Sequence, residues 1–265
     1  MKGGLFAQLR VKLPALIPPP PRFTRALMSQ DVSPHPAPLS PSNDTPKTLA
    51  ESAYLQLRQD IVTGKHAPGS KLRVEHLKAL YRVGAGTLRE ALLLLVTDAL
   101  VTVQGQRGFR VAPISLDDFE DITRVRTLLE TEALLLSMQH GDDAWESEAV
   151  AAFHRLTLVE ARLEQADVGF DEWETQNRAF HDSLLAACPS LWLRHFLSML
   201  YQQSERYRRL VLFDAPVPRN VHAEHEALLN AALQRDTKTA RQLITQHIQA
   251  TLTAIRSLPA SRFPT

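Results

Sequence analysis

The most constraining feature of the sequence is the pattern of residues 48–111, where three short helical segments precede two short strands. Apolar residues recur at helical spacing from Leu49 to Ile61, and a second helix is predicted over Val74–Tyr81. A third helix is predicted, with Gly86 or Thr87 as its N-cap and its end at about Ala99. Residues 101–103 and 109–111 have strand character and are joined by a glycine-containing turn. Three helices and a hairpin in so short a segment predict a winged helix-turn-helix.

The chain after Pro113 is helical in pattern throughout. Glycine, proline or aspartate separates the successive apolar-periodic segments. Six helices with short connections predict an antiparallel all-helical bundle, so we expect a mainly α protein with two structured parts. The helices are predicted over 116–139, 143–165, 170–187, 190–213, 218–234 and 237–256.

The first 46 residues hold ten of the seventeen prolines, and we predict a disordered tail there. Translation starting at Met28 is an alternative explanation of this segment. Its apolar stretch is broken by Pro14 and lacks a clear cleavage site, which argues against a targeting peptide. With one cysteine and no apolar run of about 20 residues, the chain is expected to be cytoplasmic and independent of membranes. We divide it into a tail (1–46), a DNA-binding domain (47–113), an effector-binding and dimerisation domain (114–258) and a C-terminal tail (259–265).

Charge is distributed unevenly between the two structured parts. Residues 47–113 contain ten Lys and Arg against five acidic residues, whereas residues 114–265 contain fifteen against twenty-two. Only the first part is therefore expected to bind a polyanion. Since a winged helix lays its third helix in the major groove, the predicted partner is double-stranded DNA.

Arg89 is the strongest candidate for contacting bases, because it lies in the first turns of the predicted recognition helix and its fork suits guanine or a phosphate pair. Thr87 can donate to a phosphate, and Arg107 lies at the wing tip beside Gly108, where a missing Cβ permits close approach. Each of these residues, taken alone, could equally be an ordinary exposed polar residue. The predicted DNA-binding residues are Arg73, Arg82, Thr87, Arg89, Arg107 and Gly108, with further phosphate contacts available from Lys71 and Arg110.

Residues 88–92, 99–101 and 107–111 resemble the GntR family of bacterial transcriptional regulators. The helical second part resembles the FadR-type (FCD) subfamily, so the resemblance covers residues 48–255. Within it, residues 51–54, 87–92 and 100–103 are similar to the carbon-starvation-induced repressors of glutarate and 4-aminobutyrate catabolism. The resemblance implies a homodimeric repressor that a small organic acid, such as the dicarboxylate glutarate, releases from its operator. This chain departs from the family just before the recognition helix, where members usually have Ser-Arg and it has Gly84-Ala85. Because a common DNA-contacting arginine is missing, the resemblance does not imply which operator sequence the protein binds.

Three histidines and one amide are candidates for a metal site. Asn177 and His181 share one face of a predicted helix, and His225 and His247 lie on two later helices, so all four could converge inside a bundle. The spacing alone leaves scattered core or surface histidines as the alternative, because the chain has ten. The family resemblance strengthens the metal interpretation, since its metal-binding members carry Asp or Asn before Phe-His, then Glu-His, then a His in the last helix. It implies a divalent ion, with zinc or nickel the leading candidates.

A site of Asn177 and three neutral imidazoles contributes no negative ligand, so we expect an anionic effector to balance the ion. Arg126 is one candidate to hold the effector's carboxylate, although it could instead pair with Glu130 four residues on, and Arg206 and Tyr207 are others. The rival interpretation is a helical-bundle metal-dependent hydrolase, because a three-histidine site with an open position can activate water. Glu224 and Asp182 are carboxylates close in sequence to these histidines, and neither is an obvious general base. We therefore assign no catalytic residue and do not predict an enzyme.

Overall fold

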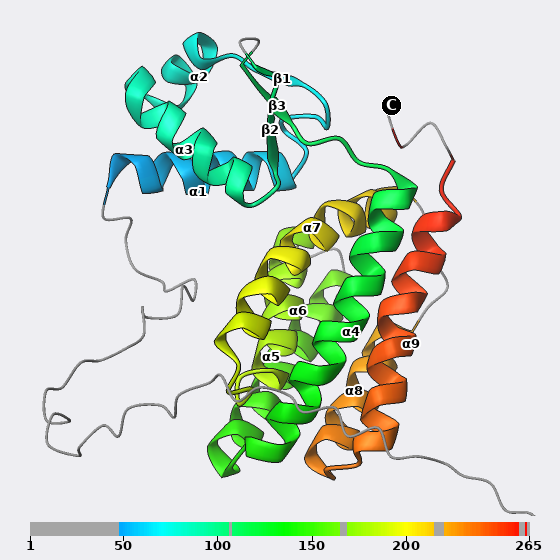
Figure 1. Ribbon diagram of the computed structural model, residues 1–265. Coiled ribbons are helices and arrows are strands. Elements are labelled where there is room, and N and C mark those ends of the chain that lie inside the picture. Colours follow the sequence, from blue (N-terminus) through cyan, green and yellow to red (C-terminus); the bar gives the residue numbers. More distant parts are fainter. Residues whose placement is uncertain (1–47, 106–107, 165–168, 215–219, 260–262, 264–265) are drawn as a thin grey trace, which may run out of the picture. The chain divides into compact units, whose positions relative to one another are not determined.

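The computed structural model describes residues 48–105, 108–164, 169–214, 220–259 and 263 (Figure 1). The predicted N-terminal tail, the wing-tip Arg107 and most of the predicted C-terminal tail lie outside the described residues.

The first structured part consists of three helices and a small sheet (Figure 1). The helices are α1 (Leu49–Val62), α2 (Val74–Tyr81) and α3 (Ala85–Thr97), and the strands are β1 (Lys71–Leu72), β2 (Val101–Val103) and β3 (Phe109–Val111). The strands are antiparallel in the order β1-β3-β2, with Thr102 opposite Arg110. This arrangement confirms the predicted winged helix-turn-helix. The two-residue strand β1 was not predicted, because it is too short to show an alternating pattern.

The start of α3 differs from the prediction. The cap is Gly84, which has no side chain to satisfy the first amides, and Thr87 already lies within the first turn. The Leu88 amide bonds to the Gly84 carbonyl at 3.0 Å, so the helix begins two to three residues before the expected caps. The helix also ends earlier than predicted, at Thr97, because Ala99 adopts a left-handed backbone with φ of 56°.

The second structured part is a bundle of the helices α4 (Leu116–His140), α5 (Asp143–Glu164), α6 (Phe170–Leu184), α7 (Leu191–Asp214), α8 (Val221–Leu233) and α9 (Thr237–Arg256). The predicted antiparallel bundle is confirmed, and most helix ends fall within three residues of their predicted positions. The largest differences are of three residues: α8 begins at Val221 rather than 218, and α6 ends at Leu184 rather than 187. Pro189 disfavours helical backbone at Cys188, whose amide closes a turn onto the Leu185 carbonyl.

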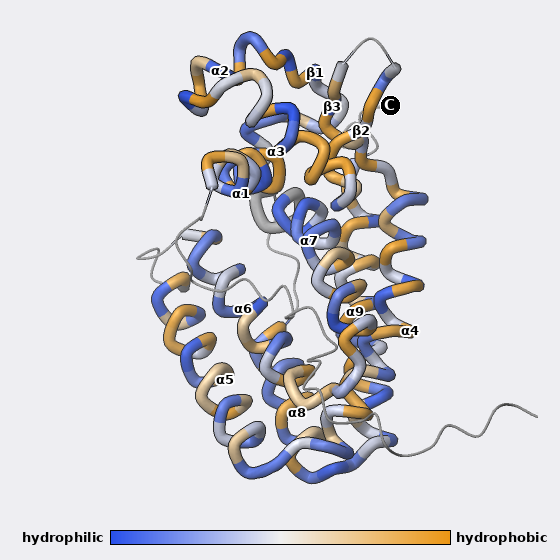
Figure 2. The backbone as a smooth tube through the Cα atoms, turned by 60° about the vertical axis from the view of Figure 1, so that its left-hand side comes forward, coloured by the Kyte–Doolittle hydropathy of each residue, from blue (hydrophilic) through white to orange (hydrophobic). Residues whose placement is uncertain are grey.

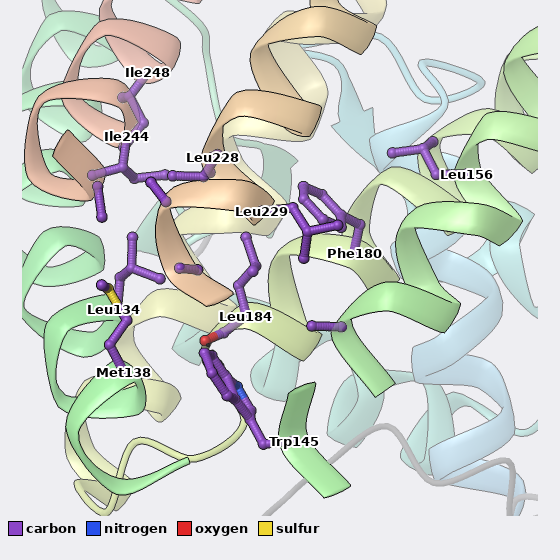
Figure 3. Close-up of a cluster of buried hydrophobic side chains, with 14 of the residues drawn as sticks. Leu134, Met138, Trp145, Leu156, Phe180, Leu184, Leu228, Leu229, Ile244 and Ile248 are labelled. Atoms are coloured by element: carbon purple, nitrogen blue, oxygen red, sulfur yellow. Dashed lines mark hydrogen bonds between the residues drawn. The ribbon is translucent and has the colours of Figure 1, made fainter. Parts of the chain in front are cut away.

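Polar and apolar residues alternate along the bundle helices (Figure 2), as expected when one face of each is buried. The main core gathers around Leu134, Leu184, Leu228 and Ile244, and the Trp145 ring closes one end by donating to the Leu184 carbonyl at 3.3 Å (Figure 3). The hydrophobic core of the first part contains only residues between 53 and 111. The hydrophobic cores of the bundle contain only residues between 114 and 263. No described helix is long and apolar enough to span a membrane.

Candidate metal centre and DNA-binding surface

Three of the four predicted metal ligands lie together inside the bundle. His181 comes from α6, His225 from α8 and His247 from α9, and one ligand nitrogen of each lies within 4.8 Å of the others. Their ring centroids are 4.8–5.3 Å apart. His181 and His225 are buried, and the His247 side chain is 11% exposed. Core residues on the same helices hold this arrangement: Phe180 packs on His225, and Ile244 and Ile248 flank His247.

Each of the three imidazoles has a carboxylate near its Nδ1. His247 Nδ1 is 2.8 Å from Glu224 Oε2, His181 Nδ1 is 3.3 Å from Glu130 Oε1, and His225 Nδ1 is 3.9 Å from an oxygen of Glu160. A neutral imidazole carries one N–H, and a carboxylate favours that proton on the nitrogen facing it. Nε2 is then the nitrogen left with a lone pair for a ligand in His181 and His247, whereas the 3.9 Å between Glu160 and His225 is too long for a hydrogen bond.

The three histidines fit a divalent transition metal. Nitrogens bound to one zinc ion are at most about 4 Å apart, so an inward shift of under about 1 Å would bring these imidazoles to bonding distance. Neutral imidazole suits zinc, nickel, copper and iron alike, so the ligand set does not choose between them. A bound ion would supply a Lewis-acidic centre able to take a carboxylate oxygen.

Asn177, the fourth predicted ligand, is buried one turn before His181. Its Nδ2 donates to the Tyr201 hydroxyl at 2.7 Å, which leaves its carbonyl oxygen as the atom able to bind a metal. Tyr201 is also buried, and three guanidinium groups surround its ring at 4.3–5.3 Å, those of Arg126, Arg178 and Arg208. Burial raises the pKa of Tyr201 well above its ordinary value, so the hydroxyl stays neutral.

Arg126 forms the ion pair with Glu130 that the sequence left open as an alternative to effector binding. Arg126 Nη2 lies 2.8 Å from Glu130 Oε2, and the two side chains are 6% and 3% exposed. Burial by itself would raise the pKa of Glu130, but Arg126 and the hydrogen bond from His181 hold it well below the usual range. Arg126 is thus already paired, and its contact with an effector stays a prediction.

Arg206 and Tyr207 hold the segment that connects the sheet to the bundle. Arg206 donates to the Ala112 carbonyl at 2.6 Å, and the Tyr207 hydroxyl accepts from the Ser115 amide at 3.1 Å and donates to Asp118 at 2.6 Å. No hydrogen bond or ion pair described for either residue involves the three histidines. Their predicted role as effector ligands stays untested.

The predicted DNA-binding residues lie on the surface of the first part. Arg89 on α3, Arg73 before α2 and Arg82 after α2 are exposed, and Thr87 is half-buried. Gly108 has a φ of +88°, a backbone conformation that glycine adopts without strain. Arg110, named as a source of further phosphate contacts, instead donates to Gln104 and to the Gly69 carbonyl.

Sequence reasoning missed Glu160 and Tyr201 completely. Each lies on a helix whose other residues gave no metal-binding pattern. Glu160 contacts His222, 62 residues away, and Tyr201 contacts Asn177, 24 residues away. Glu130 was noticed only as a partner for Arg126, and Glu224 only as a neighbour of His225. No spacing rule connects a carboxylate on one helix to an imidazole on another, so only the structure could have found these pairs.

Residues 49–111 match the gntR family of bacterial regulatory proteins, and residues 121–250 match the FCD domain. The chain is 46% identical to the uncharacterised HTH-type transcriptional regulator BphR of Paraburkholderia xenovorans, over 79% of this chain and 86% of the relative. It is 35% identical to the HTH-type transcriptional repressor GlaR of Escherichia coli, over 78% and 96%.

The chain belongs to the gntR family and carries an FCD domain. It is therefore a ligand-responsive, DNA-binding transcriptional regulator and not a hydrolase. The sequence-based prediction of family and function is confirmed.

Two solved structures share the fold. A putative GntR regulator from Rhodococcus sp. RHA1 aligns with a TM-score of 0.63 at 20% identity, covering 79% of this chain and 99% of that one. McbR/YncC of Escherichia coli aligns with a TM-score of 0.65 at 21% identity, covering 79% and 97%.

Proposed function

We propose that the protein is a homodimeric repressor whose FCD domain binds a divalent metal ion and, next to it, a small organic acid. The observation that carries this proposal is the convergence of three buried histidines from three helices, each with its Nδ1 near a carboxylate. In this proposal residues 47–113 bind a double-stranded DNA operator in the cytoplasm, and residues 114–258 bind the effector and form the dimer.

The proposed metal is zinc or nickel, with Asn177, His181, His225 and His247 as its ligands. An organic acid fits the site because a carboxylate oxygen can complete the coordination of an ion that the protein binds through four neutral groups. The resemblance to repressors of glutarate catabolism favours a dicarboxylate such as glutarate.

The metal is tested by calorimetric titration of zinc and of nickel into chelator-treated protein. We expect one site per chain in the wild type and no such site in His181→Ala or His225→Ala. Thr245→Ala, on α9 beside the site but without a proposed ligand, serves as the control. A wild type that binds neither ion would contradict the proposed metal site.

The regulation is tested by fluorescence anisotropy with labelled DNA from the region flanking the gene. Glutarate should weaken DNA binding by about 5- to 150-fold, the range of typical allosteric couplings, and only when the metal is present. Succinate and acetate show whether chain length and the second carboxylate matter. DNA binding that no organic acid changes would contradict the proposed effector class.

The dimer is proposed because two recognition helices must reach half-sites about 34 Å apart or less on one face of the duplex. Light scattering coupled to gel filtration should give twice the chain mass of 29.7 kDa. A monomer that persists in the presence of operator DNA would contradict it.

A further inference from the structure

The four proposed ligands are neutral, yet the site is rich in carboxylates. Glu130, Glu160 and Glu224 come from α4, α5 and α8, and each has an oxygen within 3.9 Å of the Nδ1 of a different histidine. Glu130 is buried, and the side chains of Glu160 and Glu224 are 15% and 30% exposed. Three independent elements therefore place negative charge on the outer side of the same cluster.

We propose that Glu130, Glu160 and Glu224 form a carboxylate shell that supplies the negative charge that balances the metal ion, and that Glu130 and Glu224 also orient the imidazoles of His181 and His247. Glu160 contributes charge alone, because its hydrogen-bond partner is His222, at 2.7 Å. This inference rests on the proposed metal site, and it names residues that the metal ligands alone do not include. It also changes the expectation drawn from Asn177, because the charge need not come from the effector.

The shell acts on both orientation and charge. A carboxylate on Nδ1 fixes the ring and the tautomer, so that Nε2 faces the ion, and it makes that nitrogen a stronger donor. Because the shell is attached to the protein, its charge is present whether or not an acid is bound. An effector carboxylate then competes for an open coordination position without being needed for charge balance.

Glu130 connects the shell to Arg126. One carboxylate oxygen faces His181 Nδ1 at 3.3 Å, and the other lies 2.8 Å from Arg126 Nη2. Arg126 thus fixes the carboxylate that fixes the imidazole. In this arrangement Arg126 is a positioning residue for the metal site. The effector's carboxylate is held by the metal ion and not by Arg126.

The test compares three glutamate-to-glutamine variants by calorimetric zinc titration after chelator treatment. Glu130→Gln and Glu224→Gln should each lower zinc affinity by about 10- to 100-fold, the usual effect of losing such a partner. Glu174→Gln is the matched control. Glu174 is as buried as Glu130 and also pairs with an arginine, Arg208, but no contact with the three histidines is described for it.

Thermal unfolding of the metal-free proteins separates folding from metal binding. Glu130→Gln and Glu174→Gln should both lower the midpoint, because each leaves a buried arginine without its charged partner. Only Glu130→Gln and Glu224→Gln should also lose part of the increase in midpoint that zinc produces in the wild type. Glu224 is partly exposed, so its variant gives an answer even if Glu130→Gln does not fold.

Repeating the titrations with glutarate tests the charge balance. Zinc affinity should rise with the acid in the wild type, because an acid that coordinates the ion tightens zinc by the same factor by which zinc tightens the acid. It should rise by a larger factor in Glu224→Gln, because the acid there also replaces a lost charge. Zinc binding in both variants that equals the wild type would overturn the shell while leaving the metal site standing. A wild type that binds no zinc would overturn the metal site and the shell together. An equal rise in the wild type and in Glu224→Gln would show that Glu224 contributes no charge to the balance.

Discussion

Arg89 is placed as a base-contacting residue should be, exposed on the first turns of α3. Arg89 acts electrostatically on Glu75 of α2: a hydrogen bond from Lys78 chiefly, with a smaller contribution from the charge of Arg89, lowers the pKa of Glu75. Because this contact is exposed, water and salt weaken it, and Arg89 can leave Glu75 for DNA at little cost.

Arg89→Ala should therefore weaken specific operator binding by about 1–3 kcal/mol, the range for losing a bidentate base contact. The thermal midpoint should not change. Arg124→Ala, an exposed arginine on α4, serves as the control and should bind DNA as the wild type does. Anisotropy titration measures both, and equal affinities for the two variants would remove Arg89 from the interface.

The hydroxyl of Tyr81 connects two groups within the first part of the chain. It donates to Asp60 at 2.5 Å and contacts His66 Nε2 at 2.8 Å. Burial would raise the pKa of Asp60, but hydrogen bonds from Lys65 and Tyr81 outweigh it and lower that pKa. A lowered carboxyl pKa stabilises the fold above the unfolded value near 4, and this contribution is lost as the pH falls through the folded value.

Tyr81→Phe should reduce the free energy of unfolding by about 1.5–3 kcal/mol at pH 7, as expected for a hydrogen bond to a charged group. The loss should shrink below about pH 4, where Asp60 becomes protonated. Urea unfolding at several pH values measures this. In an Asp60→Asn background the same substitution should cost less at pH 7, and an unchanged cost there would show that the Asp60 bond is not responsible.

Among residues, the sequence predicted the three histidines but not what surrounds them. His181, His225 and His247 could be proposed because helix periodicity and a family pattern applied to them. Glu160 and Tyr201 could not, because their contacts depend on how far each helix is rotated and shifted against its neighbours. Local patterns carry no information on that rotation.

At the level of elements, the start of α3 carries Gly84-Ala85, the departure from the family pattern noted in the sequence. Gly84 caps it without a side-chain hydrogen bond, and a Cβ on Gly84 would meet open space. Its φ of −68° suits any residue, so the glycine is not needed for the backbone. The helix therefore has room for the Ser-Arg pair that related regulators carry there.

Ala85→Arg should strengthen DNA binding and increase the magnitude of the salt dependence by about one unit of log affinity per log salt, as for one added phosphate contact. Ala85→Gln is the uncharged control and should leave the salt dependence unchanged. Anisotropy titrations at several salt concentrations give the slopes. Identical slopes for the two variants would show that position 85 does not face the DNA.

Helices were the elements most accurately predicted, because their length gives many repeats of the apolar period. The bounds of α2, β2 and β3 agree with the prediction residue by residue. Strand β1 was missed because two residues cannot display a period, and its pairing with β3 depends on the turn at 66–69 bringing it back.

At the level of the whole molecule, the connection between the two parts is short and held at both ends. The Ala112 carbonyl accepts from Arg206, and the Ser115 amide donates to the Tyr207 hydroxyl. Ile114 between them is buried in the bundle. A displacement of the start of α4 should therefore be transmitted to β3 almost undiminished.

Inserting Gly-Ser-Gly between Pro113 and Ile114 should preserve zinc binding and DNA binding but reduce the effect of glutarate on DNA affinity to less than threefold. The added residues are flexible and absorb the movement. Alanine substitutions at two exposed residues of α5, Glu148 and Arg155, serve as a control for general disturbance. An insertion variant that responds to glutarate as the wild type does would show that the connection does not transmit the response.

The separate cores described above have a consequence for how such regulators diversify. Since residues 53–111 and residues 114–263 are packed around different side chains, a crossover in the gene near Pro113 disrupts neither core. Recombination there can join the promoter preference of one family member to the metabolite preference of another in a single event. The same junction suits laboratory hybrids in which this bundle drives a reporter gene of choice.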